Sequence, residues 1–129
     1  MFARLAAIPG VRLICLQKGE ALEELRRVRA NVPAEIPAAP FDEGPQAFLD
    51  SAALMSALDL IITGDTALAH LAGALGRPTW IALKQVPDWR WLLEGTDCPW
   101  YPTARLFRQP RLGDWESVFT AIHAELARA

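Results

Sequence analysis

Cysteine, lysine and histidine are scarce in this chain of 129 residues. The two cysteines are Cys15 and Cys98, and neither has a second cysteine or a histidine at the spacing of a metal-binding motif. The sequence therefore predicts no metal site, and a reduced, cytoplasmic protein is expected. Cys15 stands in an apolar run, so we expect it to be a small, buried hydrophobic residue.

Long hydrophobic runs are also missing. No segment approaches the roughly 18 apolar residues that a membrane span needs. The first residues, MFARLAAIPG, are not expected to form a signal peptide, because Pro9-Gly10 and Arg12 interrupt the apolar stretch. They resemble the end of a helix without its beginning, so we expect a fragment of a larger two-domain protein. The net charge is -2, which gives no sign of a nucleic-acid-binding protein.

What the sequence does contain is 52% hydrophobic residues, enough for one compact domain over residues 1–129. Short apolar runs alternate with helical patterns. Strands are predicted at residues 11–16, 36–41, 59–63, 79–83 and 104–107, and helices at 20–30, 50–58, 66–75 and 115–126. Asp50-Ser51 and Asp114 are expected to cap the second and fourth of these helices. Because the strands are continuous apolar runs, we predict an α/β fold with a doubly wound, mainly parallel Rossmann-like sheet.

The helix within TGDTALAHLAGALGRP, residues 63–78, is small or apolar almost all round. At about 100° per residue, His70 lies about 150° from the centre of the apolar stripe. That stripe consists of Leu68, Leu71, Ala72 and Leu75. The neighbours of His70 on the helix are all small: Ala67, Ala69, Gly73 and Ala74. We therefore expect His70 to lie on a bare face that a ligand can approach.

The start of this helix is a candidate anion site. Its first backbone N–H groups have no intrahelical partner and carry partial positive charge, which suits a phosphate or diphosphate. Gly64 is expected to allow a sharp turn, and Thr66 adds a hydroxyl. Asp65 would repel a phosphate, so it either caps the helix or accepts a hydrogen bond from a sugar. The alternative is that Asp65 only caps and that His70 is a partly buried structural residue.

A second candidate is the turn Gln17-Lys18-Gly19, which follows the first predicted strand. Parallel strands end at one edge of a sheet, so Lys18 is expected on the same edge as Asp65 and Thr66. Its ammonium group would add a positive charge for a diphosphate. The alternative is a lysine in a solvated turn. Neither a dinucleotide-binding glycine motif nor a Walker-type motif is present.

The third candidate is VPDWRWLLEGTDCPWYP, residues 86–102, which places four aromatic residues in one loop with a helical turn near residues 89–93. They can form a wall for a nucleobase or sugar, fold the loop onto the domain, or meet a partner domain. No nucleophile and base are paired in the sequence, so no catalytic residue is assigned.

The stretch DTALAHLAGALGRPTWIAL resembles the D-T-x-x-x-H-L-A-x-A-L-G-x-P signature of the heptosyltransferase-like glycosyltransferases, glycosyltransferase family 9. It also resembles the related C-terminal domains that follow tetratricopeptide repeats in bacterial proteins. LQKG and the stretch PDWRWLLEGTDCPWYPTARLFRQP are more similar to this second group. The resemblance implies one half of a GT-B enzyme, in which two Rossmann-like domains face each other across a cleft.

The resemblance also implies site residues and partners. Asp65, Thr66, Ala67 and His70 would line the diphosphate and sugar of the donor, and Gln17 with Lys18 would contact its phosphates. The carboxylate that holds the ribose stays open among Asp42, Glu43 and Asp50. The donor would be a nucleoside diphosphate sugar, with no other cofactor. The missing N-terminal domain, or tetratricopeptide repeats, would be the protein partner.

Three hypotheses follow. In the first, the chain is the donor-binding half of an inverting, metal-independent glycosyltransferase whose base comes from the missing half. In the second, it is a catalytically inactive module that binds a nucleotide or a protein. In the third, it is a self-contained flavodoxin-like α/β domain.

Overall fold

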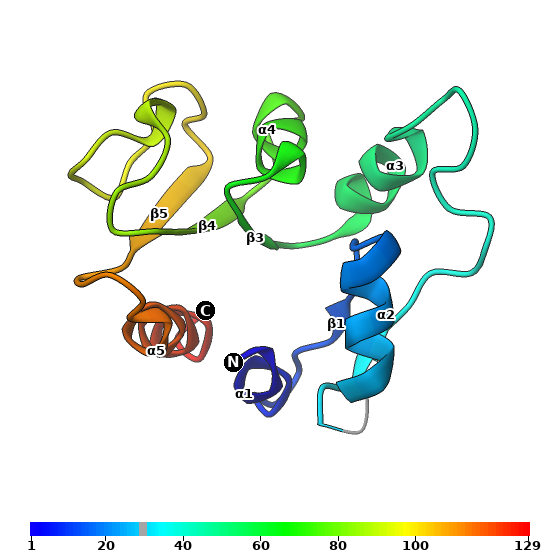
Figure 1. Ribbon diagram of the computed structural model, residues 1–129, viewed down its shortest axis with the longest axis horizontal. Helices are drawn as coiled ribbons and strands as arrows, with labels where there is room; N and C mark the ends of the chain where they lie inside the picture. The colour runs from blue at the N-terminus through cyan, green and yellow to red at the C-terminus, as the bar shows by residue number, and fades with distance from the viewer. Residues whose placement is uncertain (29–30) are drawn as a thin grey trace.

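The computed structural model describes residues 1–28 and 31–129, and its strands and helices alternate along the chain (Figure 1). The strands are β1 (Leu13–Ile14), β2 (Ala34–Glu35), β3 (Ile61–Gly64), β4 (Thr79–Leu83) and β5 (Ala104–Arg108). The helices are α1 (Phe2–Ala6), α2 (Gly19–Val28), α3 (Leu49–Ala57), α4 (Ala67–Ala74) and α5 (Trp115–Leu126), with a 3-10 turn η1 (Trp89–Trp91). The end of the helix predicted at 20–30 lies outside the described residues. The α/β, Rossmann-like class is confirmed.

The larger sheet has the order β3-β4-β5, and its neighbouring strands run parallel. Side chains alternate along β4: Ile81 and Leu83 pack with Ala69 of α4 on one face, and Ala82 packs with Ile122 of α5 on the other. Figure 1 shows α4 and the loop that precedes β5 above this sheet, with α5 and α1 below it. Helices thus cover both faces, as parallel strands require.

The smaller sheet pairs β1 with β2, also in parallel, with Leu13 opposite Ala34. The strand predicted at 36–41 was misplaced. It lies two residues earlier, at Ala34–Glu35, and it ends before Pro37 and Pro40, which have no N–H group to donate to a ladder. Arg12 and Glu35 reinforce the pair at its surface through an ion pair of 2.9 Å.

A cavity of about 460 Å³ lies between the two sheets. Its walls are mainly aliphatic and come from β1, α2 and β3, including Ile14, Leu25 and Ile62. Within residues 1–28 and 31–129, no backbone hydrogen bond joins β1 to β3. The parallel strands therefore form two hydrogen-bonded units rather than one continuous sheet.

The ends of the helices test three predictions. Asp114 caps α5 as expected, and its Oδ1 accepts a hydrogen bond from the N–H of Ser117 at 3.1 Å. Gly76, with φ of +64°, follows the last turn of α4 as expected. The prediction for α3 was wrong. Phe48 occupies the N-cap position, and the carboxylate that serves this end comes from Asp42, earlier in the chain.

The burial of α4 also differs from the predicted stripe. Ala69 and Ala72 are fully buried, Leu68 and Leu71 are partly buried, and Leu75 is exposed. Alanine, not leucine, thus occupies the most deeply buried positions of this helix. No helix in the described part of the chain is long and apolar enough to cross a membrane.

Candidate functional site

The connection from β3 to α4 leaves the start of α4 uncapped. Thr66 is the N-cap residue in an extended conformation, yet its hydroxyl lies 3.2 Å from the hydroxyl of Thr63 and does not return to the helix. Among the described residues, no side chain caps this terminus. The first N–H groups of α4 are therefore free of side-chain partners, as an anion site at a helix start requires.

Gly64 and Asp65 depart from their expected local roles. Gly64 is the last residue of β3 and pairs with Ala82. A Cβ placed on it would lie 3.8 Å from the carbonyl oxygen of Ala82, an ordinary contact, so the turn does not require glycine. Asp65 is exposed and does not cap α4, which removes the capping explanation for this residue.

His70 is half-buried, and part of the small face around it is covered by the aromatic loop. Its Nδ1 lies 3.0 Å from the hydroxyl oxygen of Tyr101, and its ring stacks on Trp91 with a centroid distance of 5.1 Å. A Cβ on Gly73 would lie 2.4 Å from Cγ of Tyr101. The small residues around His70 thus admit a tyrosine of the same chain, and the expected bare face is closed on that side.

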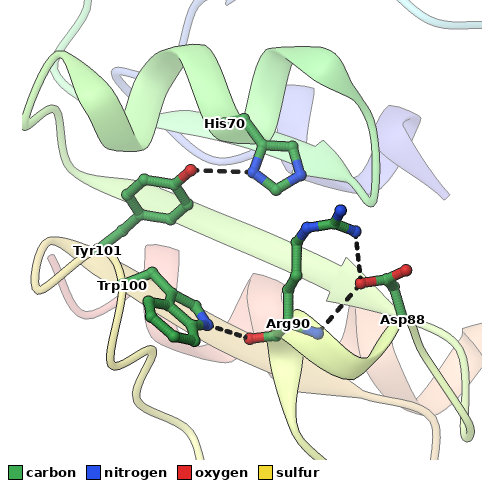
Figure 2. Close-up of polar contacts among 5 residues, drawn as sticks. All are labelled: His70, Asp88, Arg90, Trp100 and Tyr101. Atoms are coloured by element: carbon green, nitrogen blue, oxygen red, sulfur yellow. Dashed lines mark hydrogen bonds and ion pairs between the residues drawn. The ribbon is translucent and has the colours of Figure 1, made fainter.

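The other side of His70 faces two charged residues. Figure 2 shows Nε2 of His70 directed away from Tyr101, on the side where the guanidinium group of Arg90 lies. Asp88 accepts hydrogen bonds from the backbone N–H of Arg90 at 3.1 Å and from its guanidinium at 2.7 Å. These two bonds, together with the charge of Arg90, hold the pKa of Asp88 below its ordinary value. Asp88 is thus a carboxylate anion held within the loop by Arg90.

Lys18 lies beside a different group of residues. Its ammonium group donates to the backbone carbonyl of Asp42, in the segment that precedes α3. The carboxylate of Asp42 is buried and accepts hydrogen bonds from the N–H groups of Asp50 and Ser51 and from the hydroxyl of Ser51. Burial alone would raise the pKa of Asp42, but these hydrogen bonds outweigh it and hold the pKa below the ordinary value.

These contacts narrow the choice of a ribose-binding carboxylate. Both oxygens of Asp42 serve the start of α3. Asp50 accepts a hydrogen bond from the N–H of Asp42 at 2.7 Å. Glu43 is exposed. Of the three candidates, Asp42 is therefore the one whose carboxylate is most fully used in hydrogen bonds within the fold. A contact with the ribose stays a prediction for Glu43 and Asp50.

The predicted site residues fall into two groups. Gly64, Asp65, Thr66, Ala67 and His70 lie together where β3 passes into α4. Lys18 lies with Asp42, and in the described part of the chain no hydrogen bond joins it to α4. Gln17 is exposed, and it lines the cavity between the sheets together with Thr63, which places the end of β1 near the end of β3.

Sequence reasoning missed Asp88, Arg90 and Tyr101 as neighbours of His70. The sequence Asp-x-Arg is not a recognised motif. Tyr101 is 31 residues away from His70 along the chain, so local patterns do not reveal their contact. A signal was present in Gly73, since a glycine inside a helix is unfavourable unless close packing requires it. Within the described ranges, no cluster of His, Cys, Asp and Glu is suited to hold a metal ion.

Comparisons with known proteins agree with this architecture. The family described as glycosyltransferase family 9 (heptosyltransferase) matches residues 7–83, which include the start of α4 and His70 but not the aromatic loop. Protein FlbA of Caulobacter vibrioides is 38% identical over 110 residues, which cover 84% of this chain and 18% of FlbA. The chain thus spans less than a fifth of the length of that relative. No solved structure matches it.

Proposed function

Because this chain belongs to glycosyltransferase family 9 (heptosyltransferase), we propose that it is the donor-binding domain of a GT-B glycosyltransferase. The donor is a nucleoside diphosphate sugar. Its diphosphate lies at the start of α4, and its sugar lies toward His70. A second domain, preceding this one in the complete protein, supplies the acceptor site. The protein partner is this second domain or, alternatively, tetratricopeptide repeats.

One observation carries this proposal: the uncapped N-terminus of α4 at the end of a parallel strand, with His70 one turn along the helix. Ligands of open α/β folds bind at this edge of the sheet. The free N–H groups and the helix dipole favour a diphosphate there. The exposed Asp65 is at the correct end of the helix to accept a hydrogen bond from a sugar hydroxyl.

The proposed chemistry is displacement at the anomeric carbon of the donor. An acceptor oxygen forms the new bond to that carbon as the bond to the diphosphate breaks, and the acceptor proton passes to a base. Negative charge grows on the departing diphosphate, where the amides of α4 stabilise it. The ammonium group of Lys18 also stabilises the negative charge on the diphosphate if it leaves the carbonyl of Asp42. The base belongs to the second domain.

Thermal unfolding in the presence of ADP, GDP, UDP and inorganic phosphate tests the proposal. A ligand at about 100 times its dissociation constant adds about 2.7 kcal/mol of stability. In a domain of this size, that raises the melting temperature by several degrees. A shift with one nucleoside diphosphate, larger than the shift with phosphate, is the expected result. No shift with any of them contradicts donor binding.

A second candidate function is that of an inactive module that binds a nucleotide or a protein. Two observations favour it. Lys18 is engaged by the carbonyl of Asp42, and the aromatic loop exposes several large apolar side chains. In such a module, replacement of Lys18 would leave ligand binding intact, which separates the two candidates.

A further inference from the structure

The loop before β5 exposes two tryptophans that the fold does not need for its core. The side chains of Trp89 and Trp100 are 68% and 57% exposed, and their rings meet edge to face with a centroid distance of 6.2 Å. Val86, Leu92 and Leu93 nearby are exposed as well. This loop lies outside the segment that matches the family, so the family does not account for it.

The loop is held in place by a buried ring and by hydrogen bonds. Trp91 of the same loop is fully buried, and its carbonyl accepts a hydrogen bond from Arg108 of β5 at 3.1 Å. The indole N–H of Trp100 donates to the carbonyl of Arg90 at 2.9 Å. Figure 2 shows this bond beside the Asp88–Arg90 pair. A surface fixed in this way loses little conformational entropy when a ligand binds.

Charged groups border the exposed rings. The guanidinium carbon of Arg90 lies over one face of a Trp89 ring, 5.0 Å from its centroid, and Asp88 forms an ion pair of 2.7 Å with that guanidinium. An aromatic surface edged by a carboxylate and a guanidinium is well suited to bind a sugar ring. A sugar ring has a C–H face that packs on aromatic rings, and its hydroxyl groups bond to charged planar side chains.

We propose that Trp89 and Trp100, edged by Asp88 and Arg90, form a binding site for a sugar ring. A protein partner fits this surface less well. A stable protein interface takes about 20–30 residues from each side, whereas the exposed cluster is a handful of side chains on one loop. A small ligand needs only an apolar surface and a few fixed polar groups, which is what the loop offers.

The position of the site ties it to transfer of a sugar, and in this respect the inference rests on the proposed function. Asp88 and Arg90 lie on the side of His70 that faces away from Tyr101 (Figure 2), and His70 is one turn from the start of α4. Two sugars meet at this place in the reaction: the sugar of the donor, and the sugar of a glycan acceptor that the second domain holds against this one. Both present the same chemistry, so the experiment separates them.

The test is NMR titration of the indole N–H signals in the intact 129-residue chain. The probes are methyl glucoside and methyl mannoside, followed by UDP-glucose, GDP-mannose and ADP-heptose, each beside its own nucleoside diphosphate. The signals of Trp89 and Trp100 are expected to shift with at least one sugar. Trp89→Ala is expected to weaken that binding about two- to tenfold, the range for one lost aromatic contact. Leu112→Ala removes an even more exposed apolar side chain elsewhere on the chain and is expected to change nothing.

The arms of the titration identify the source of the sugar. If the site holds the donor sugar, Trp89→Ala weakens binding of the nucleotide sugar but not of its nucleoside diphosphate. If it holds the acceptor sugar, the methyl glycosides bind even when the nucleotide sugar is saturating. Indole signals that stay still with every sugar, up to the limit of solubility, overturn the inference. Failure of all nucleoside diphosphates to bind contradicts the proposed function instead, and the glycoside arm still decides the sugar site.

Discussion

The hydroxyl oxygen of Tyr101 lies 3.0 Å from Nδ1 of His70 and joins the aromatic loop to α4. This contact fixes which edge of the imidazole meets the protein and which edge faces the charged residues of the loop (Figure 2). The partner of one ring nitrogen determines the tautomer, and therefore what the other nitrogen can donate or accept. Tyr101 is thus a positioning residue for His70.

Tyr101→Phe removes this hydrogen bond and keeps the ring. We expect the free energy of unfolding to fall by about 1 kcal/mol, the usual contribution of one hydrogen bond. The 15N shifts of the His70 ring are expected to change, because Nδ1 loses its partner. Trp100→Phe is the control, since it removes a hydrogen bond of the same loop that does not involve His70. Unchanged His70 shifts in Tyr101→Phe would show that the contact does not set the tautomer.

Gly73→Ala places a methyl group 2.4 Å from Cγ of Tyr101. Since the tyrosine ring has to move, we expect a loss of about 1–3 kcal/mol in urea unfolding. Gly64→Ala is the matched control, because its methyl group meets only an ordinary contact, and a change within about 0.5 kcal/mol is expected. In a Tyr101→Ala background, Gly73→Ala should no longer lower the free energy of unfolding. A penalty that persists there would place the clash elsewhere.

Lys18→Ala tests the cation predicted for the diphosphate. We expect the affinity for the best nucleoside diphosphate, measured by calorimetry, to fall while the protein stays folded. The lost bond to the carbonyl of Asp42 is exposed to solvent on the lysine side, so stability should fall by no more than about 1 kcal/mol. Lys84→Ala, at the other lysine of the chain, serves as the control. Equal affinity in Lys18→Ala removes Lys18 from the site and favours the inactive module.

Asp42→Asn tests the buried carboxylate that serves α3. The pKa of Asp42 is depressed in the folded protein, so its stabilisation is present well above the ordinary value of 3.8 and is lost as the pH falls below it. The amide cannot accept at both former oxygens, and we expect a loss of about 1–3 kcal/mol at pH 7 together with a flatter acid dependence. Glu43→Gln, at the exposed neighbour, should match the wild type. The same acid dependence in Asp42→Asn and wild type would contradict this assignment.

Local patterns were sufficient for β4 and for the start of α5. The run Thr79–Leu83 is apolar and β-branched, and the structure has a strand at the same residues. Asp114 sits three residues before Ser117 and caps α5 as its position indicates. In these elements each signal acts over a few neighbouring residues, and the fold reinforces it.

Contacts between distant residues were beyond the reach of such patterns. Asp50-Ser51 looks like a helix cap, but Asp42 provides the carboxylate from eight residues away. The face around His70 looks open, but Tyr101 fills it from the far end of a loop. In both cases the partner comes from a distant part of the sequence. Only the three-dimensional path of the chain determines which residue reaches the start of α3 or the small face around His70. The residues predicted for the diphosphate, Lys18 and Thr66 among them, stay predictions.

The cavity between β1 and β3 has a consequence for how the molecule opens. In the part of the chain that the structure describes, no backbone hydrogen bond crosses that gap, so β1 and β2 can separate without breaking the ladders of β3, β4 and β5. Amide protons of β1 and β2 should then exchange with deuterium through a low-energy local opening, whereas those of β4 should exchange only through global unfolding. The part of the molecule around β1 and β2, which carries Lys18, would open first. The part around β3, β4 and β5, which carries His70, would open last.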